Sequence, residues 1–237
     1  MRESRKYTAL DREHPMVPGG DLDEFTLSAL REALAEMRGP VEVDLFVGDG
    51  CYYCVESIKL LRQFERLSPL REGGRLLRLR VHDVDSAPEL ARRYRVERTP
   101  TIAMLGGRVR WTGIPSGEEV RSLVETILRI SEGASGLSES SKRAVRGLRK
   151  EIDLKVVVTP LCPYCPYAVV LSHMIAFESY LGGDGKVRSD AIEAFENPDI
   201  AEHYGITTVP AVIIDEEEVI MGLPDEDYLI ERIAERA

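Results

Sequence analysis

The sequence repeats one local pattern at a distance of nearly half its length. Its four cysteines form two C-x-x-C pairs that superimpose when the sequence is shifted by 111 residues: Cys51, Cys54, Cys162 and Cys165. Further matches follow at shifts of 110 and 109, where 88–96 falls on 198–206 and 113–115 falls on 222–224. Such slowly drifting self-similarity is typical of two copies of one structural unit, and 237 residues is long enough for both.

A short stretch rich in serine and glycine, residues 131–136, is the expected linker between the copies. It predicts an N-terminal domain over 1–132 and a C-terminal domain over 133–237, each with one C-x-x-C pair. Because the linker is short, we expect the two domains to pack against each other.

Both copies have the same order of predicted elements: a helix, a strand, a helix opened by the C-x-x-C pair, a strand, a short helix, two strands and a closing helix. In the first copy these lie near 24–37, 41–47, 52–67, 76–82, 87–94, 101–105, 108–112 and 117–131. In the second they lie near 138–149, 152–158, 163–181, 187–194, 198–204, 211–215, 218–221 and 225–236. Each cysteine pair therefore lies where a strand turns into a helix.

That position has a chemical consequence for the cysteines. The first turn of a helix offers unpaired N–H groups and a partial positive charge, which pull a cysteine pKa below its free value of about 8.5. The first cysteine of each pair is thus predicted to be a nucleophile. The second lies one turn on and can attack the mixed disulfide that the first forms with a partner. Each pair, Cys51–Cys54 and Cys162–Cys165, is predicted to be a reversible two-electron carrier.

Spacing and charge disfavour several other kinds of function. Zinc sites with two C-x-x-C pairs typically have a spacer of about 15–20 residues, whereas 107 residues lie between Cys54 and Cys162, although distant pairs can converge in space. A net charge of −10 with scattered Lys and Arg disfavours nucleic acid as a partner. No stretch approaches the roughly 18 apolar residues of a membrane span, and the start lacks a secretory signal, so we expect a cytoplasmic protein.

The amide composition indicates a thermophilic source. Asn197 and Gln63 are the only two side-chain amides, and depletion of thermolabile amides beside abundant charge is typical of high working temperatures. Chance or a GC-rich genome is the alternative, which explains the excess of Arg over Lys but explains the missing amides less well. Intracellular disulfides are common in hyperthermophiles, so cytoplasmic redox-active disulfides are compatible with this composition.

Two prolines stand at equivalent positions just before an apolar strand. Thr99-Pro100 and Val209-Pro210 lie at nearly the same distance from their cysteine pairs, which favours a shared role over an ordinary proline at a strand start. A cis peptide bond at either proline is compatible with the sequence but is not specified by it.

The strand, the C-x-x-C helix and the proline ahead of a hairpin together resemble the thioredoxin and glutaredoxin superfamily. Residues 162–165, C-P-Y-C, have the glutaredoxin form of the motif. Two such units in tandem resemble the glutaredoxin-like protein disulfide oxidoreductases of hyperthermophilic archaea and bacteria. This resemblance implies an α/β enzyme of two thioredoxin-like units, each a central mixed four-stranded sheet flanked by helices, that reduces, forms or reshuffles disulfides in other proteins.

The resemblance also implies roles for individual residues. Cys51 and Cys162 would be the nucleophiles, and Cys54 and Cys165 would resolve the mixed disulfides. Residues of the proline loops and of the two motifs would contact the substrate chain: Thr99, Pro100, Val209, Pro210, Tyr52, Tyr53, Pro163 and Tyr164. For the three motif tyrosines an equal alternative is that they are simply exposed rings.

One position departs from the family pattern. Thioredoxins have a buried acid six residues before the first cysteine, which accepts the proton of the resolving thiol, but Leu45 and Val156 stand there in this chain. Water or another carboxylate would have to take that role.

Partners and alternatives complete these expectations. The resemblance implies protein substrates with thiols or disulfides, a flavoprotein of the thioredoxin-reductase type as electron donor, and no bound cofactor or metal besides the two disulfides. One alternative is an electron carrier that reduces a peroxiredoxin-type peroxidase, although in such reductases only one unit keeps its cysteines. Another is a non-catalytic scaffold, either bridged by zinc or stapled by disulfides.

Overall fold

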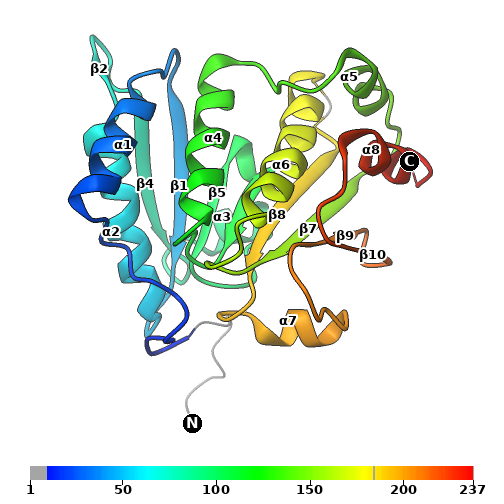
Figure 1. The fold of residues 1–237 in the computed structure, drawn as a ribbon. Coiled ribbons are helices and arrows are strands. Elements are labelled where there is room, and N and C mark those ends of the chain that lie inside the picture. Colours follow the sequence, from blue (N-terminus) through cyan, green and yellow to red (C-terminus); the bar gives the residue numbers. More distant parts are fainter. Residues whose placement is uncertain (1–9, 184, 237) are drawn as a thin grey trace.

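The computed structural model describes residues 10–183 and 185–236, and the two sequence copies fold as two similar units (Figure 1). The first unit contains α1 (Glu24–Leu34), β1 (Val41–Val47), α2 (Tyr52–Leu67), β4 (Leu77–Asp83), α3 (Pro88–Arg93), β5 (Thr101–Met104), β6 (Val109–Thr112) and α4 (Glu119–Glu132). The second contains α5 (Glu139–Arg146), β7 (Ile152–Val158), α6 (Cys165–Leu181), β8 (Val187–Glu193), α7 (Pro198–His203), β9 (Ala211–Ile214), β10 (Glu218–Met221) and α8 (Glu226–Ala234). All sixteen elements predicted from the sequence are present.

Three short elements had no counterpart in the sequence prediction. They are the small antiparallel pair β2 (Leu70–Arg71) and β3 (Gly74–Arg75), and a single turn of 3-10 helix, η1 (Leu105–Gly107). The two-residue strands are too short for an alternating pattern to reveal them.

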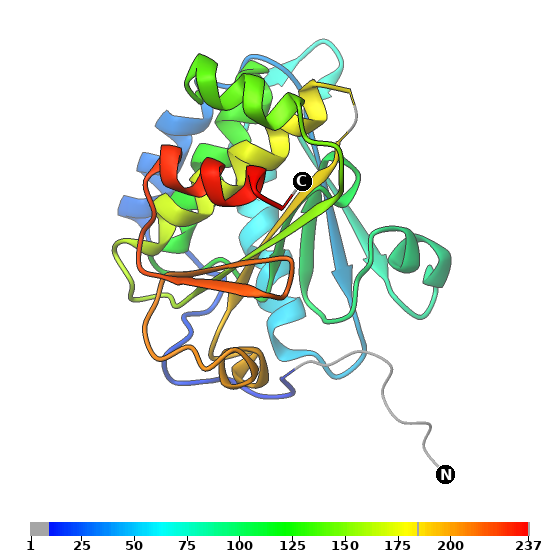
Figure 2. The same cartoon turned by 90° about the vertical axis from the view of Figure 1, so that its right-hand side faces the viewer.

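The two units share one continuous sheet. Each contributes four strands, as expected, but the strands join in the order β10-β9-β7-β8-β6-β5-β1-β4, because β6 pairs in parallel with β8. The α/β fold with a mixed sheet is therefore confirmed, and the two four-stranded sheets are halves of an eight-stranded one. Helices α2, α4 and α6 pack on one face of this sheet, and α3 lies on the opposite face (Figure 2).

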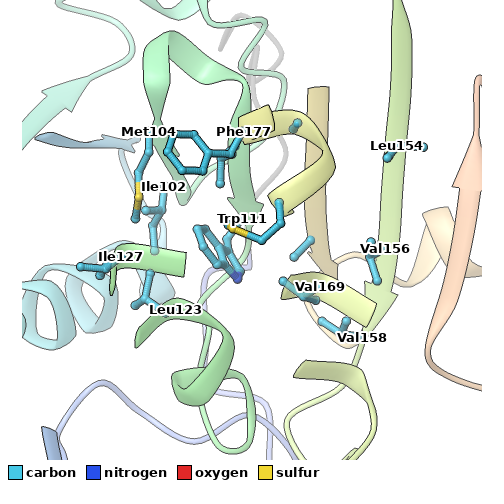
Figure 3. Packing of buried hydrophobic residues seen from close by; sticks show 14 of the residues in the cluster. Ile102, Met104, Trp111, Leu123, Ile127, Leu154, Val156, Val158, Val169 and Phe177 are labelled. Carbon is cyan, nitrogen blue, oxygen red and sulfur yellow. The ribbon is translucent and has the colours of Figure 1, made fainter. Parts of the chain in front are cut away.

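A single hydrophobic core crosses the junction between the units. Trp111 of β6 is 2% exposed, and its ring meets the ring of His173 on α6 edge to face with centroids 4.3 Å apart. Figure 3 shows the Trp111 side chain between Leu123 of α4 and Val169 of α6. Burial lowers the pKa of His173 to about 3, so this ring is neutral and packs as part of the core.

The opposite face of the junction carries a buried ion pair. Arg110 of β6 donates to Asp190 of β8 at 2.7 Å, and the hydroxyl of Thr112 donates to the same carboxylate at 3.0 Å. Since Asp190 is buried and accepts charged and neutral hydrogen bonds, its negative charge is compensated. Both faces of the sheet thus tie the second unit to the first.

Candidate active sites

The first cysteine pair lies directly at the start of α2. Cys51 is the N-cap residue, and the backbone N–H of Cys54 donates to its sulfur at 3.1 Å. The two cysteines are joined by a disulfide, with their Cα atoms 5.3 Å apart. Residue 51 follows β1 by only a short loop, so the strand-to-helix placement expected from the sequence is confirmed for this pair.

The second pair has the same sulfur geometry on a different helix start. Cys162 and Cys165 form a disulfide with Cα atoms 5.4 Å apart, and the N–H of Cys165 donates to the Cys162 sulfur at 3.1 Å. The helix α6, however, begins at Cys165 and not at residue 163 as predicted. The segment before it is a turn, closed by a hydrogen bond of 3.3 Å from the Cys165 N–H to the Cys162 carbonyl. Pro163 and Pro166 have no N–H to contribute to this turn.

The two cysteines of each pair differ slightly in exposure. Cys51 is 6% exposed and Cys54 3%, while Cys162 is 8% exposed and Cys165 is fully buried. In both pairs the first cysteine is therefore the one that an incoming sulfur atom reaches more easily. The second cysteine faces the protein interior, which suits attack on its neighbour rather than on an outside group.

The two proline loops have the same geometry in both units. The peptide bonds Thr99-Pro100 and Val209-Pro210 are both cis. The carbonyl of Pro100 accepts from Gly113 at 3.0 Å, and that of Pro210 accepts from Gly222 at 2.8 Å. These glycines have φ angles of +99° and +88°, which favour glycine over residues with a side chain.

The first proline loop lies against the segment that leads to the first cysteine pair. A Cβ atom on Gly48 would lie 3.0 Å from the hydroxyl oxygen of Thr99, so the backbone between β1 and Cys51 passes close to this loop. Thr99 thus lies close to the backbone that precedes the Cys51 motif.

The motif tyrosines differ from one another. Tyr164 is 63% exposed, as expected for a surface ring. Tyr53 is buried instead, and its hydroxyl accepts from the His14 backbone N–H at 2.8 Å. The expectation of an exposed ring is wrong for Tyr53, because it shares the buried side of α2 with Leu60 and Phe64. Tyr52 is partly buried.

Two further exposed apolar residues flank the second pair, and their sequence positions alone did not single them out. Leu161, just before Cys162, is 62% exposed, and Tyr167, just after the motif, is 52% exposed. The guanidinium of Arg121 on α4 lies over the Tyr167 ring at 5.5 Å. The one available signal was their adjacency to the motif: Leu161, Tyr164 and Tyr167 are exposed apolar side chains within five residues of Cys162 in the sequence.

Buried carboxyl groups lie elsewhere than in thioredoxins. Leu45 and Val156, six residues before the first cysteines, are fully buried apolar residues. Burial instead raises the pKa of Glu119 and of Glu193 to about 7, and that of Glu196 to about 8. The sequence offered one signal for Glu119, which falls on the helical stripe of buried positions on α4.

Within residues 10–183 and 185–236, no three His, Cys, Asp or Glu side chains converge as a metal ion would require. In the same part of the chain, no helix combines the length and apolar character needed to cross a membrane. The cysteines are bonded to each other in two separate pairs, so the structure does not bring the two C-x-x-C motifs together into one four-cysteine centre.

Two strand-to-helix turns, each with a C-x-x-C disulfide, define a protein of the dithiol–disulfide class built twice on the thioredoxin fold. The chain belongs to the thioredoxin-domain family, whose sequence model matches residues 41–125 and 152–234. The predicted resemblance to two-unit disulfide oxidoreductases is thereby confirmed at the level of fold, repeat and motif.

Individual relatives match either the whole chain or one unit of it. The crystal structure of a protein disulfide oxidoreductase from Aeropyrum pernix K1 is 44% identical with a TM-score of 0.91, covering 94% of this chain and 97% of that one. A thioredoxin of Methanocaldococcus jannaschii is 30% identical over 86 residues, which are 36% of this chain and 96% of the relative. An alkylhydroperoxide reductase structure from Enterococcus faecalis shares the fold, with 24% identity and a TM-score of 0.78 over 90% of this chain and 99% of that one.

Proposed function

We propose that this protein is a thiol–disulfide oxidoreductase that reduces, forms or reshuffles disulfides in other proteins through both C-x-x-C pairs. The observation that carries the proposal is the matched geometry of the two pairs. In each, the first cysteine is the more exposed residue of the two, and its sulfur accepts a backbone N–H at 3.1 Å. A hydrogen bond from N–H to sulfur favours the thiolate over the thiol once the disulfide is reduced.

The proposed reaction follows from these positions. When the protein acts as a reductant, the thiolate of Cys51 or Cys162 attacks a substrate disulfide, forms a mixed disulfide and releases one substrate thiolate. The thiol of Cys54 or Cys165 then loses its proton and attacks the first cysteine, which releases the second substrate thiolate and closes the disulfide in the protein. Disulfide formation in the substrate is the same sequence in reverse.

We further propose that the substrate chain lies along the proline loops and the motif surfaces. The backbone at Thr99 and Val209, beside Pro100 and Pro210, would pair with an extended substrate segment. The partly buried Tyr52 and four exposed residues of the second motif and its flanks would add apolar contacts: Pro163, Tyr164, Leu161 and Tyr167. Tyr53 is left out of this surface because its ring lies in the core.

The finer assignments rest on the family and on the composition. We propose domains over 1–132 and 133–237, a division supported by the end of α4 at Glu132, where Gly133 caps the helix with a φ of +79°. A flavoprotein of the thioredoxin-reductase type as electron donor follows from family membership. We propose a cytoplasmic location and no membrane or nucleic-acid partner, because the net charge is −10 and no stretch of the sequence approaches about 18 apolar residues.

The peroxidase-reducing alternative has less support. The alkylhydroperoxide reductase of Enterococcus faecalis shares the fold. A shared fold at 24% identity does not show that the two proteins have the same partner. In this chain both units have a C-x-x-C disulfide. Two complete pairs suit exchange with protein substrates at either site.

Variants that keep only one of the two cysteine pairs test the proposal. Cys162→Ser/Cys165→Ser and Cys51→Ser/Cys54→Ser proteins should each still reduce insulin disulfides with dithiothreitol as electron source, since each unit has its own pair. We expect the variant that keeps Cys162 and Cys165 to retain the larger share, because its motif is of the glutaredoxin form. Loss of all activity in both variants would contradict the independence of the two sites, and a more active N-terminal pair would reverse the expected order.

A further inference from the structure

Glu119 has a buried carboxyl group to which no cation among the described residues is bonded. Its side chain, the first of α4, is 1% exposed. One oxygen, Oε2, accepts from the hydroxyl of Ser122 at 2.6 Å, and the other, Oε1, has no hydrogen-bond partner within residues 10–183 and 185–236. A buried polar atom without a partner is destabilising, so its presence calls for a chemical reason.

The start of α4 is fixed against the loop that carries the second cysteine pair. The N–H of Glu118 donates to the carbonyl of Pro160 at 2.8 Å, two residues before Cys162. Gly117 has a φ of +60°, and a Cβ atom there would collide with the same carbonyl. The first turn of α4, which belongs to the N-terminal unit, therefore has a defined position beside the active-site loop of the C-terminal unit.

The contacts between α4 and α6 fix the level of Glu119 along α6. The two helices run side by side in the same direction (Figure 1). Arg121 donates to the Tyr167 hydroxyl at 3.2 Å, and Thr126 contacts His173 at 3.4 Å, so facing positions differ by 46 or 47 residues. By this register Glu119 faces residues 165–166.

The side chain also points toward α6. Glu119, Ser122 and Thr126 follow one another at intervals of three and four residues, so they form one stripe of α4. Thr126, on that stripe, contacts His173 of α6. The carboxyl group of Glu119 is thus on the α6 side of α4, at the level of the fully buried Cys165.

We propose that Glu119, a residue of the N-terminal unit, accepts the proton of the Cys165 thiol when that thiol attacks the mixed disulfide at Cys162. This inference deepens the proposed function and rests on it. The Cys165 proton moves to the Glu119 carboxylate, the new thiolate forms the sulfur–sulfur bond with Cys162, and the bond between Cys162 and the substrate breaks. The released substrate thiolate is then protonated by the Glu119 carboxylic acid or by water.

The charges around Glu119 suit a group that both takes and gives a proton near neutral pH. Burial is the main cause that raises its pKa to about 7, the Ser122 hydrogen bond opposes this rise, and the neighbouring Glu118 adds to it. On α6, the register places Cys165 at the level of Glu119, and His173, which contacts Thr126 two turns further along α4, is neutral. The nearby cation, Arg121, binds Tyr167 and Glu118 instead.

This acid belongs to one site only. A shift of 109 residues, which superimposes the loops before α4 and α8, places Tyr228 at the position of Glu119, and Tyr228 is 44% exposed. The two units therefore differ here although their motifs match. The C-terminal pair would use a proton acceptor from the other unit, which gives the shared sheet a functional consequence.

The test uses the full-length Cys51→Ser/Cys54→Ser protein, in which the C-terminal pair alone reacts. The reduced protein is mixed with dithiobis(nitrobenzoate), whose coloured thiolate appears once when the mixed disulfide forms and again when Cys165 resolves it. We expect Glu119→Gln to slow the second phase by about tenfold or more at neutral pH. With Glu119 present, the rate of this phase should rise with pH around pH 7. In Glu119→Gln the rise should occur at higher pH, in the range where thiols ordinarily ionise.

Two controls separate a chemical role from a structural one. Glu125→Gln, which replaces a partly exposed glutamate of the same helix, should leave both phases unchanged. Glu119→Gln in the Cys162→Ser/Cys165→Ser protein should leave the N-terminal pair unchanged. Equal slowing of both pairs, or a slower second phase with an unshifted pH profile, would overturn the assignment. Because the probe is a small disulfide, failure of the protein to reduce insulin would contradict the proposed function without affecting this result.

Discussion

Replacing Cys51 and Cys162 together by serine is expected to abolish the reduction of insulin disulfides by dithiothreitol that the wild-type protein catalyses. Serine keeps the shape of the side chain but cannot form a thiolate at neutral pH, and the remaining cysteines are the more buried ones. The measurement is the rate of insulin precipitation, corrected for the uncatalysed reaction. Residual turnover in this variant would show that Cys54 or Cys165 acts as a nucleophile, against the mechanism.

A control for folding accompanies that experiment. The reduced wild-type protein and the double variant both lack the disulfides, so they should have the same free energy of unfolding within experimental error. If the double variant were much less stable than the reduced wild type, the loss of activity would not report on the chemistry.

Replacing Trp111 by alanine is expected to lower the free energy of unfolding by about 3–5 kcal/mol, the usual range for a fully buried Trp. The ring is 2% exposed and lies between helices α4 and α6, so its removal leaves a cavity at the junction of the units. Guanidinium titration followed by circular dichroism measures the change.

The position of Trp111 also predicts how the chain unfolds. Because one core and one sheet cross the junction, we expect the two units to unfold in a single transition. Phe25, which is 84% exposed, provides the matched control, and Phe25→Ala should change stability by less than about 0.5 kcal/mol. Two well-separated transitions, or a Trp111→Ala effect below about 1 kcal/mol, would contradict a shared core.

Local patterns in the sequence were sufficient to predict the elements and the cysteine pairs. Hydrophobic periodicity placed α2 at residues 52–67 and β7 at 152–158, which are the bounds in the structure. The repeat made each prediction twice, since an element found in one copy was expected in the other. It also identified Pro100 and Pro210 as equivalent, and both follow cis peptide bonds.

The features that escaped prediction depend on contacts between distant segments. The pairing of β6 with β8 joins the two sheets, but no local pattern specifies which edge strand of one unit meets which strand of the other. Glu119 falls on the buried stripe of α4, but no local pattern specifies which distant segment buries its carboxyl group. Tyr53 could have been placed in the core from the phase of α2, because it precedes Ser57, Leu60 and Phe64 at helical spacing.

The trapped intermediate tests the central claim most directly. In the Cys54→Ser/Cys165→Ser protein the resolving thiols are absent, so the mixed disulfide with a substrate protein should persist. After incubation with insulin, peptide mapping by mass spectrometry should find insulin cysteines bonded to Cys51 and Cys162, and dithiothreitol should release them. Failure of both cysteines to form an adduct, or preferential trapping by the Cys51→Ser/Cys162→Ser protein, would contradict the account.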